Sequence, residues 1–460
     1  MALPLRPSVP SSLTTDMALV YGSAGVAGVE THVKSLIAAA EDNVRRLTTQ
    51  IHELTLARDR ENAILIRLRR LVTPIAKLPE EVLVQIFKLV FATPRFHPHD
   101  DFMGRYGFNS TERTMYSDKT AAMRKTLGLA RVSTVWRHVV ASNPSLWTDC
   151  IVSVTMERTG ESALEGLNRL LGRSAPYPVS LSLCCPKESA LFHPPSVEIL
   201  RSTAGRWRSV EMDFDSLHHL AGFGTTQFHS LERLRIYRGS YNQKQEDTDL
   251  FLDSPRLWHA NIESDRPDRI RLPYSQLTVL ELVADSARAC RAVLLQCTNL
   301  VKAKICADHQ WDGSPLAAAS PLVTFPHLET LDLDLGEGLA DDDVDSMDAF
   351  LSVLDAPALT KLVVCWDSVC NWSGSLWPTP AVSDFQRRSP KIASLDLQFC
   401  NIERDELLTF LRFAPCLTEL RIRYSWNCVD DLLLEALRVG QQPPSGVPLV
   451  PRLTEIHWNC

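Results

Sequence analysis

Two short runs of metal-capable side chains offer the clearest prospect of chemistry in this 460-residue chain. His97, His99, Asp100 and Asp101 stand close together, and imidazole nitrogens and carboxylate oxygens are ordinary metal ligands. No distant third cluster accompanies them, and ligand type alone does not define a site. The run 341–343 consists of three aspartates but lacks the glycine and the terminal glutamate of a calcium loop, so it is more typical of an acidic helix start. We therefore predict no bound metal.

Catalytic signatures are also missing from the sequence. It has no Gly-x-Ser-x-Gly elbow, no P-loop and no Gly-x-Gly-x-x-Gly run after a strand. None of the twelve cysteines forms a Cys-x-x-Cys pair, and several (Cys306, Cys365 and Cys400) lie beside apolar, strand-like runs. We expect reduced and largely buried thiols, no cofactor, and a protein that is not an enzyme.

Composition narrows the possible partners. Charged residues make up 22% of the chain and hydrophobic residues 45%, as in ordinary globular proteins. The formal net charge of −7 argues against a nucleic-acid partner, whose phosphates require a basic surface. No run approaches the roughly 18 apolar residues that cross a bilayer, and no secretory signal is recognisable at the N-terminus. We expect no membrane partner and a cytoplasmic or nuclear location.

A long helix is predicted for residues 31–73, following a Pro-, Ser- and Gly-containing stretch (1–30) that we expect to be a disordered tail. No proline or glycine interrupts residues 31–72. One unbroken heptad frame, with Arg58 and Glu61 as its polar exceptions, holds Ile37, Ala40, Val44, Leu47, Ile51, Leu54, Leu65, Leu68 and Val72. Such a frame indicates coiled-coil character. The pattern leaves open whether 31–72 associates with another helix, including a second copy, or folds back on its own chain.

Residues 74–152 form a small, split apolar module. Leu78-Pro79-Glu80-Glu81 predicts a helix start, because proline suits the first turn and acids favour the positive end of the helix dipole. A wide apolar face follows, made by Val82, Leu83, Ile86, Phe87 and Val90. A second helix is predicted from about Ala121, with a stripe of Leu129, Val132, Trp136 and Val139, and Asn143-Pro144 predicts a third short turn. These faces expose more apolar surface than short helices can bury, which favours docking.

These residues closely resemble an F-box, in the variant common in mushroom-forming fungi. The resemblance rests on Leu-Pro-Glu-Glu-Val-Leu-x-x-Ile-Phe from Leu78, Val-Ser-x-x-Trp-Arg-x-x-Val from Val132, and Pro-Ser-Leu-Trp from Pro144. The chain departs from the family at 92–125, which is longer than the usual connection and is expected to be an insertion loop. The resemblance implies three short helices that dock on a Skp-family adaptor, which bridges to a cullin and a RING protein. The implied adaptor-binding residues are Leu78, Pro79, Val82, Leu83, Ile86, Phe87, Val132 and Trp136. We expect Leu83, Ile86 and Phe87 to be partly exposed.

The region 206–460 repeats the pattern apolar-x-x-apolar-x-apolar, as in Leu231/Leu234/Ile236, Leu277/Leu280/Leu282 and Leu417/Leu420/Ile422, at spacings of 20 to 36 residues. This pattern matches the core of a leucine-rich repeat. Several copies follow a proline by two residues, among them those after Pro255, Pro326 and Pro415. Because proline ends helices, each unit is predicted to be a helix, a turn and a short strand, stacked into an irregular α/β solenoid. Residues 153–205 are predicted to be a joining region that includes a possible first repeat.

Alternation within the strands predicts which residues face a partner. Leu280, Leu282, Leu331 and Leu333 should point into the core. The residues expected on the open sheet face, as candidates for binding a target protein, are Glu281, Asp332, Asp334, Asp396, Gln398, Arg421 and Arg423. A solvated sheet face with no ligand is the alternative for each of them.

The fold class expected is therefore α/β: a long helix with coiled-coil character, a small all-α F-box, and a leucine-rich-repeat-like domain. The resemblance implies a non-catalytic receptor subunit of an SCF-type cullin-RING ubiquitin ligase that holds an unidentified protein target. The alternative function is a protein-interaction scaffold that works outside a ligase.

Overall fold

The computed structural model describes residues 26–92, 126–148, 152–155, 161–184, 194–220, 228–238, 247–310, 322–335, 350–366, 377, 379–400, 402–425, 428–437 and 449–459. Two compact units are distinguished, one up to Leu83 and one from Val84 onward. The metal-capable runs at 97–101 and 341–343, the insertion 93–125 and the tail 1–25 lie outside the described residues.

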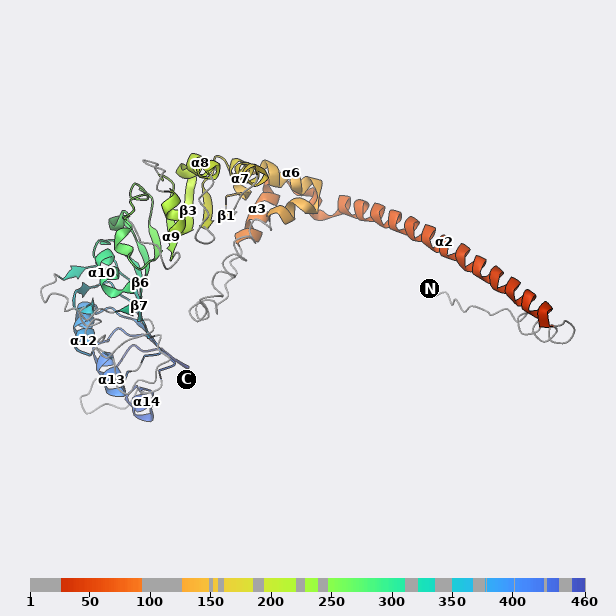
Figure 1. Ribbon diagram of the computed structural model, residues 1–460. Coiled ribbons are helices and arrows are strands. Elements are labelled where there is room, and N and C mark those ends of the chain that lie inside the picture. The colour runs from red at the N-terminus through yellow and green to blue at the C-terminus, as the bar shows by residue number, and fades with distance from the viewer. Residues whose placement is uncertain are drawn as a thin grey trace. The chain divides into compact units, whose positions relative to one another are not determined.

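The first unit is dominated by one continuous helix, α2 (Val26–Val72), followed by the short turn η1 (Pro74–Lys77) (Figure 1). The predicted helix is confirmed, but it begins five residues before Thr31, so 26–30 belong to the helix and not to a tail. Nearly every described side chain of α2 is exposed, including the large apolar residues of the heptad frame. Isolated helices normally need packing on an apolar face for stability, so α2 exposes a face that a partner could cover.

Helix α3 (Glu80–Ala92) starts where the sequence predicts, with the carbonyl of Pro79 accepting from the amides of Val82 and Leu83. The second predicted helix is divided. Residues 126–132 are helical, and α6 (Thr134–Ser142) begins after a break at Ser133, whose hydroxyl accepts from the amide of Trp136 and caps α6. The short turn η2 (Pro144–Leu146) follows, as Asn143-Pro144 predicts, although the Asn143 amide donates back to the Val139 carbonyl instead of capping η2.

A parallel sheet is the largest feature of the second unit. Among the described residues it has 12 strands, and strand order follows chain order. The strands are β1 (Val152–Thr155), β2 (Val179–Cys184), β3 (Trp207–Asp213), β4 (Arg233–Tyr237), β5 (His259–Glu263), β6 (Val279–Ser286), β7 (Lys302–Gln310), β9 (Thr330–Leu335), β11 (Lys361–Trp366), β12 (Ser394–Gln398), β13 (Glu419–Arg423) and β14 (Glu455–Asn459). The segment predicted to join the two domains thus contributes two strands. A separate parallel pair joins β8 (Val323–Thr324) to β10 (Leu354–Asp355).

The apolar repeat explains this arrangement. The second and third apolar residues of neighbouring copies are in register: Leu234, Ala260 and Leu280 pair in series, as do Ile236, Ile262 and Leu282. All of these are at most 2% exposed, and burying one such leucine contributes about 1.5–3 kcal/mol. Turns place the first apolar residue: the amides of Leu257, Leu328, Leu359, Leu417 and Leu453 each bond to the carbonyl three residues earlier, with proline second in each turn.

Helices cover one side of the sheet (Figure 1). They are α7 (Glu161–Arg173), α8 (Pro194–Thr203), α9 (Phe214–Leu220), α10 (Ala287–Leu294), α12 (Thr379–Arg388), α13 (Arg404–Arg412) and α14 (Asp431–Leu437). Helix α10 packs on β6 and β7, and α9 on β2 and β3. The predicted inward residues Leu280, Leu282, Leu331 and Leu333 are buried, as expected. The side chains between them form what we call the polar face.

Candidate functional site

The polar face is hollowed near its N-terminal end, over β2 to β6. The hollow has a volume of about 340 Å³ and is lined by Ser180, Ser209, Glu211, Arg233, Arg235, His259, Asn261 and Glu281, among others. These residues stand between the buried apolar residues of each strand, so the strand's two-residue period brings them to one surface. The hollow therefore combines cations, anions and amide groups, the mixture that recognises polar surface and not an apolar ligand.

Polar groups in the hollow bond to one another and to side chains beside it. Arg235 donates to Glu263 at 3.0 Å, Tyr237 donates to Glu211 at 2.9 Å, and Asn261 donates to Glu281 at 2.7 Å. Nε2 of His259 lies 3.5 Å from Oε1 of Glu281. This imidazole lowers the pKa of the Glu281 carboxyl, against the opposing effect of desolvation, and Lys304 and Arg235 act in the same direction. Glu281 is thus held as a carboxylate.

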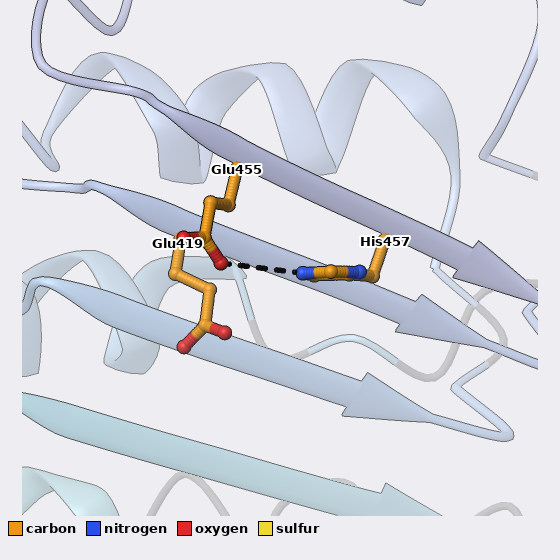
Figure 2. A group of neighbouring side chains, drawn as sticks. All are labelled: Glu419, Glu455 and His457. Atoms are coloured by element: carbon orange, nitrogen blue, oxygen red, sulfur yellow. Dashed lines mark hydrogen bonds and ion pairs between the residues drawn. The ribbon is translucent and has the colours of Figure 1, made fainter.

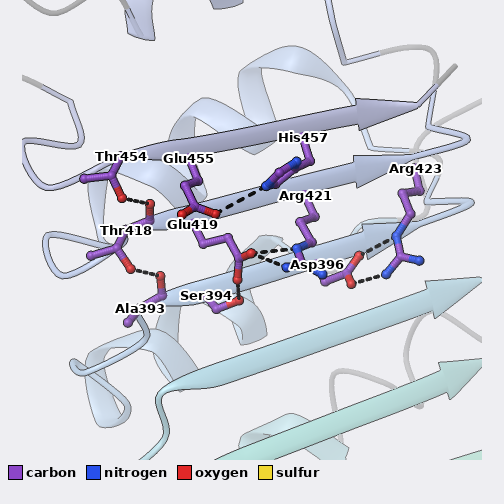
Figure 3. Close-up of polar contacts among 10 residues, drawn as sticks. All are labelled: Ala393, Ser394, Asp396, Thr418, Glu419, Arg421, Arg423, Thr454, Glu455 and His457. Carbon is purple, nitrogen blue, oxygen red and sulfur yellow. Dashed lines mark hydrogen bonds and ion pairs between the residues drawn. The ribbon is translucent and has the colours of Figure 1, made fainter. Parts of the chain in front are cut away.

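A second network lies on β12 to β14 (Figure 3). Ser394 donates to Glu419 at 2.6 Å, and Nε of Arg421 donates to the other oxygen of that carboxylate at 2.7 Å. The Ser394 hydroxyl is the main cause of the lowered pKa of Glu419. Beside it, the Arg423 guanidinium donates two hydrogen bonds to Asp396, whose side chain is only 4% exposed. A bidentate pair of this kind fixes both side chains in place.

Glu419, Glu455 and His457 are the group of possible metal ligands found among the described residues (Figure 2). Their ligand atoms lie within 4.8 Å of one another, and His457 Nε2 is 3.4 Å from Glu455 Oε2. The two oxygens of Glu419 already accept from Ser394 and Arg421, so a cation there would compete with a serine hydroxyl and a guanidinium. Glu455 and His457 are exposed. The donors fit a polar surface cluster better than a metal centre, which requires converging ligands.

The residues predicted to bind a target are spread along this face. The structure brings Asp396 and Arg423 into direct contact and places Arg421 beside Glu419. Glu281 lies on β6, which three strands separate from β12, and belongs to the other network. Asp334 and Asp396 are 4% and 3% exposed, so these two are not the open contacts that alternation predicts. Asp332, Gln398, Arg421 and Arg423 are half-buried.

Sequence reasoning did not select Arg235, Asn261, His259, Glu263 and Ser394, which the structure places on the same face. For two of these residues the sequence contained the signal that selected Glu281, a position between the second and third apolar residues of a repeat. Arg235 stands between Leu234 and Ile236, and Asn261 stands between Ala260 and Ile262. Ser394 and Glu419 instead precede the second apolar residue of their repeats and are paired by register.

The predicted adaptor-binding residues of the split module differ in how far their side chains are exposed. Leu78 is half-buried, while Pro79 and Val82 are exposed, Val82 to 42%. In the second unit, Val132 is 46% exposed and Ile86 is half-buried. The expectation of partial exposure is confirmed for Ile86 but is wrong for Leu83 and Phe87, which are 2% and 1% exposed. For Phe87 the cause is ring packing, since its centroid lies 4.8 Å from that of Trp136.

Most cysteine side chains that the structure describes are buried. The buried ones are Cys290, Cys297, Cys365, Cys400 and Cys428, whereas Cys306 and Cys416 are half-buried. Burial raises the pKa of Cys297 to about 12 and that of Cys428 to about 11, so both stay protonated near neutral pH. This agrees with thiols that fill the core.

Comparison with known proteins adds little to this α/β architecture. No protein-family model matches the chain, and no curated protein does. A crystal structure of a protein from Bacteroides fragilis is similar over 66% of this chain and 73% of its own, with 13% sequence identity and a TM-score of 0.23. Such a similarity assigns neither fold nor function. None of the described helices has both the length and the apolar character needed to cross a membrane.

Proposed function

We propose that this protein is a substrate receptor of an SCF-type cullin-RING ubiquitin ligase. The observation that carries the proposal is the F-box-like sequence block from Leu78 to Trp147, whose motifs fall on α3, α6 and η2, with a parallel sheet built on a leucine-rich-repeat pattern after it. In this role the F-box docks a Skp-family adaptor, and through it a cullin, while the sheet domain holds a target protein. The receptor would act by proximity, because holding the target raises its effective concentration near the transferring enzyme.

The target would be held by the polar face. Its hollow over β2 to β6 is lined by carboxylates, guanidinium groups and an amide. A complementary target would carry charged groups that form ion pairs with these side chains. We infer a leucine-rich-repeat-like solenoid as the architecture, because β5, β9, β11, β13 and β14 each follow a proline turn and the repeated apolar columns stack in register. Ubiquitin transfer itself would take place on other subunits.

A second function is favoured by one specific observation. Leu83 and Phe87 are buried in the single chain, so an adaptor that needs them would require a rearrangement of α3. A scaffold that binds proteins outside a ligase has no such requirement. Both functions are non-catalytic, and they differ in whether an adaptor is captured.

Adaptor capture by the full chain separates the two functions. We would co-purify the protein with a Skp-family adaptor and compare it with the double variant Val82→Asp and Val132→Asp. Both residues are exposed, so the substitution should leave folding intact, which avoids the collapse expected from a charge at Leu83 or Phe87. Leu432→Asp on α14 is the matched control, because Leu432 is 57% exposed and lies far along the chain from the module.

We expect the wild type and Leu432→Asp to retain adaptor and the double variant to lose at least tenfold in affinity, the equivalent of about 1.4 kcal/mol. Wild-type protein that fails to capture adaptor, under conditions in which other F-box proteins do, rules out the ligase function and leaves the scaffold. Capture that survives the double variant would place the docking surface elsewhere.

A further inference from the structure

We propose that α2 pairs with α2 of a second copy of this chain, as an antiparallel coiled coil centred between Arg58 and Glu61. This pairing is independent of the proposed ligase function. It would make the protein a homodimer through its first unit.

The heptad seam of α2 is the first ground for this pairing. Its large apolar residues, among them Val44, Ile51, Leu54, Leu65 and Val72, are all at least 46% exposed in the single chain. From Ile37 to Val72 they follow one heptad frame, in a segment without proline or glycine, and only Arg58 and Glu61 interrupt the stripe within a helix that is 47 residues long. A stripe of this length cannot be covered by a short segment, but a second α2 matches it in length and period.

The two charged residues in the seam determine the orientation. In a parallel pair, equivalent positions meet, so Arg58 would face Arg58 and Glu61 would face Glu61 of the second copy. In an antiparallel pair, the layers join the first and fourth heptad positions, so Arg58 of each copy meets Glu61 of the other. Charges inside a helical interface are costly unless they are paired. Charge complementarity therefore favours the antiparallel pair.

The same charges fix the register. With Arg58 opposite Glu61, the flanking layers join Leu54 to Leu65, Ile51 to Leu68 and Leu47 to Val72, and every one of these is apolar with apolar. A shift by one heptad would instead set Arg58 against Leu54 and Glu61 against Ile51, leaving both charges unpaired. One register thus satisfies the whole seam from 47 to 72, and polar residues at core positions are known to select register in this way.

The flanks of the seam do not favour a parallel pair. In a parallel pair, the positions beside the seam would join Gln50 to Thr55, Ala57 to Asn62 and Ile64 to Arg69, so no oppositely charged pair rewards that orientation. In the single chain Arg58 bonds to its neighbour Asp59 at 2.8 Å, with both side chains more than half exposed. Exposed pairs of this kind contribute little, so Arg58 can exchange Asp59 for Glu61 of the second copy at small cost.

The mass of the full chain in solution, measured by light scattering across a concentration series, tests the association. Leu65→Glu on the seam and Ile66→Glu beside it form a matched pair, since the two residues are adjacent and are 46% and 53% exposed. We expect a dimer for the wild type and for Ile66→Glu, and a monomer for Leu65→Glu. Glu61→Arg should also be monomeric, because all four central charges become positive. Non-specific hydrophobic association would respond equally to both members of the matched pair and would overturn the proposal.

Orientation is tested by a short lysine-reactive crosslinker on a mixture of isotopically labelled and unlabelled full chains. Residues 34–72 of one continuous helix separate Lys34 from Lys77 within one chain, roughly 57 Å at 1.5 Å per residue, which is beyond the reach of such a reagent. The antiparallel register sets Lys34 of one copy about 20 Å along the axis from Val72 of the other, at the end of the pair where Lys77 follows five residues later. We expect mixed-label Lys34–Lys77 crosslinks. A dimer that yields only Lys34–Lys34 and Lys77–Lys77 crosslinks is parallel, and a wild type that stays monomeric overturns the proposal.

Discussion

Helix α2 and the polar face of the sheet differ in whether their surface side chains already have partners within the chain. On α2, large apolar residues stand exposed along one seam, interrupted only by Arg58 and Glu61. On the polar face, carboxylates such as Asp396, Glu419 and Glu281 already bond to side chains of neighbouring strands. The first surface gains free energy from any partner that covers it. The second must exchange existing ion pairs for new ones, which adds little affinity but makes binding selective.

The prediction with the largest expected effect compares the loss of a buried leucine side chain with the loss of an exposed one. Leu280→Ala removes a side chain that is fully buried in β6, whereas Leu54→Ala shortens one that is 71% exposed on α2. We expect Leu280→Ala to lower the free energy of unfolding of the sheet by about 2–5 kcal/mol, because a cavity adds to the lost burial. Leu54→Ala should leave it unchanged within about 0.5 kcal/mol. Urea unfolding of the full chain, followed by circular dichroism, measures both. Equal losses would mean that α2 unfolds together with the sheet.

A second prediction compares two ion pairs within the polar face. Arg423 and Arg421 lie on β13 and each pairs with a carboxylate, but Asp396 is nearly buried and Glu419 is more open, at 4% and 21% side-chain exposure. Arg423→Met should cost about 1–3 kcal/mol, because it leaves a buried carboxylate without its donors. Arg421→Met should cost less than about 0.5 kcal/mol, since Glu419 keeps the Ser394 hydroxyl and reaches water. Urea midpoints rank the two variants, and the reverse order would show that burial does not set the strength of these pairs.

Local periodicity made part of this architecture predictable. The triplet Leu277/Leu280/Leu282 predicted a strand, because its spacing can be recognised within a few residues. The heptad spacing predicted α2 for the same reason. The start of α2 at Val26 was missed, because Gly28 and its small neighbours resemble a tail in composition. The break at Ser133 was missed because an apolar stripe does not reveal that a serine hydroxyl caps a new helix.

Burial on the polar face could not be predicted in the same way. Alternation marks Asp396 as outward, but its exposure depends on Arg423, which stands 27 residues later and reaches it only through the register of β12 and β13. The hollow over β2 to β6 likewise combines residues from five strands. Long-range register decides such features, and a sequence pattern read within one repeat does not contain it.

The smallest expected effect concerns the pH dependence of the polar face. The folded pKa of Glu281 lies below its ordinary value of 4.5, chiefly because of His259. A carboxyl with a lowered folded pKa stabilises the fold at pH above the unfolded value, and this contribution is lost as the pH falls below 4.5 through the folded pKa. Glu281→Gln should therefore be less stable than the wild type at about pH 6, with a difference that shrinks toward about pH 3. Urea midpoints across this range measure it, with Glu455→Gln, which removes an exposed carboxylate on β14, as the control. A difference that stays constant with pH would mean that the Glu281 contacts act by packing alone, and the polar face would then resemble the seam of α2 more closely than its ion pairs imply.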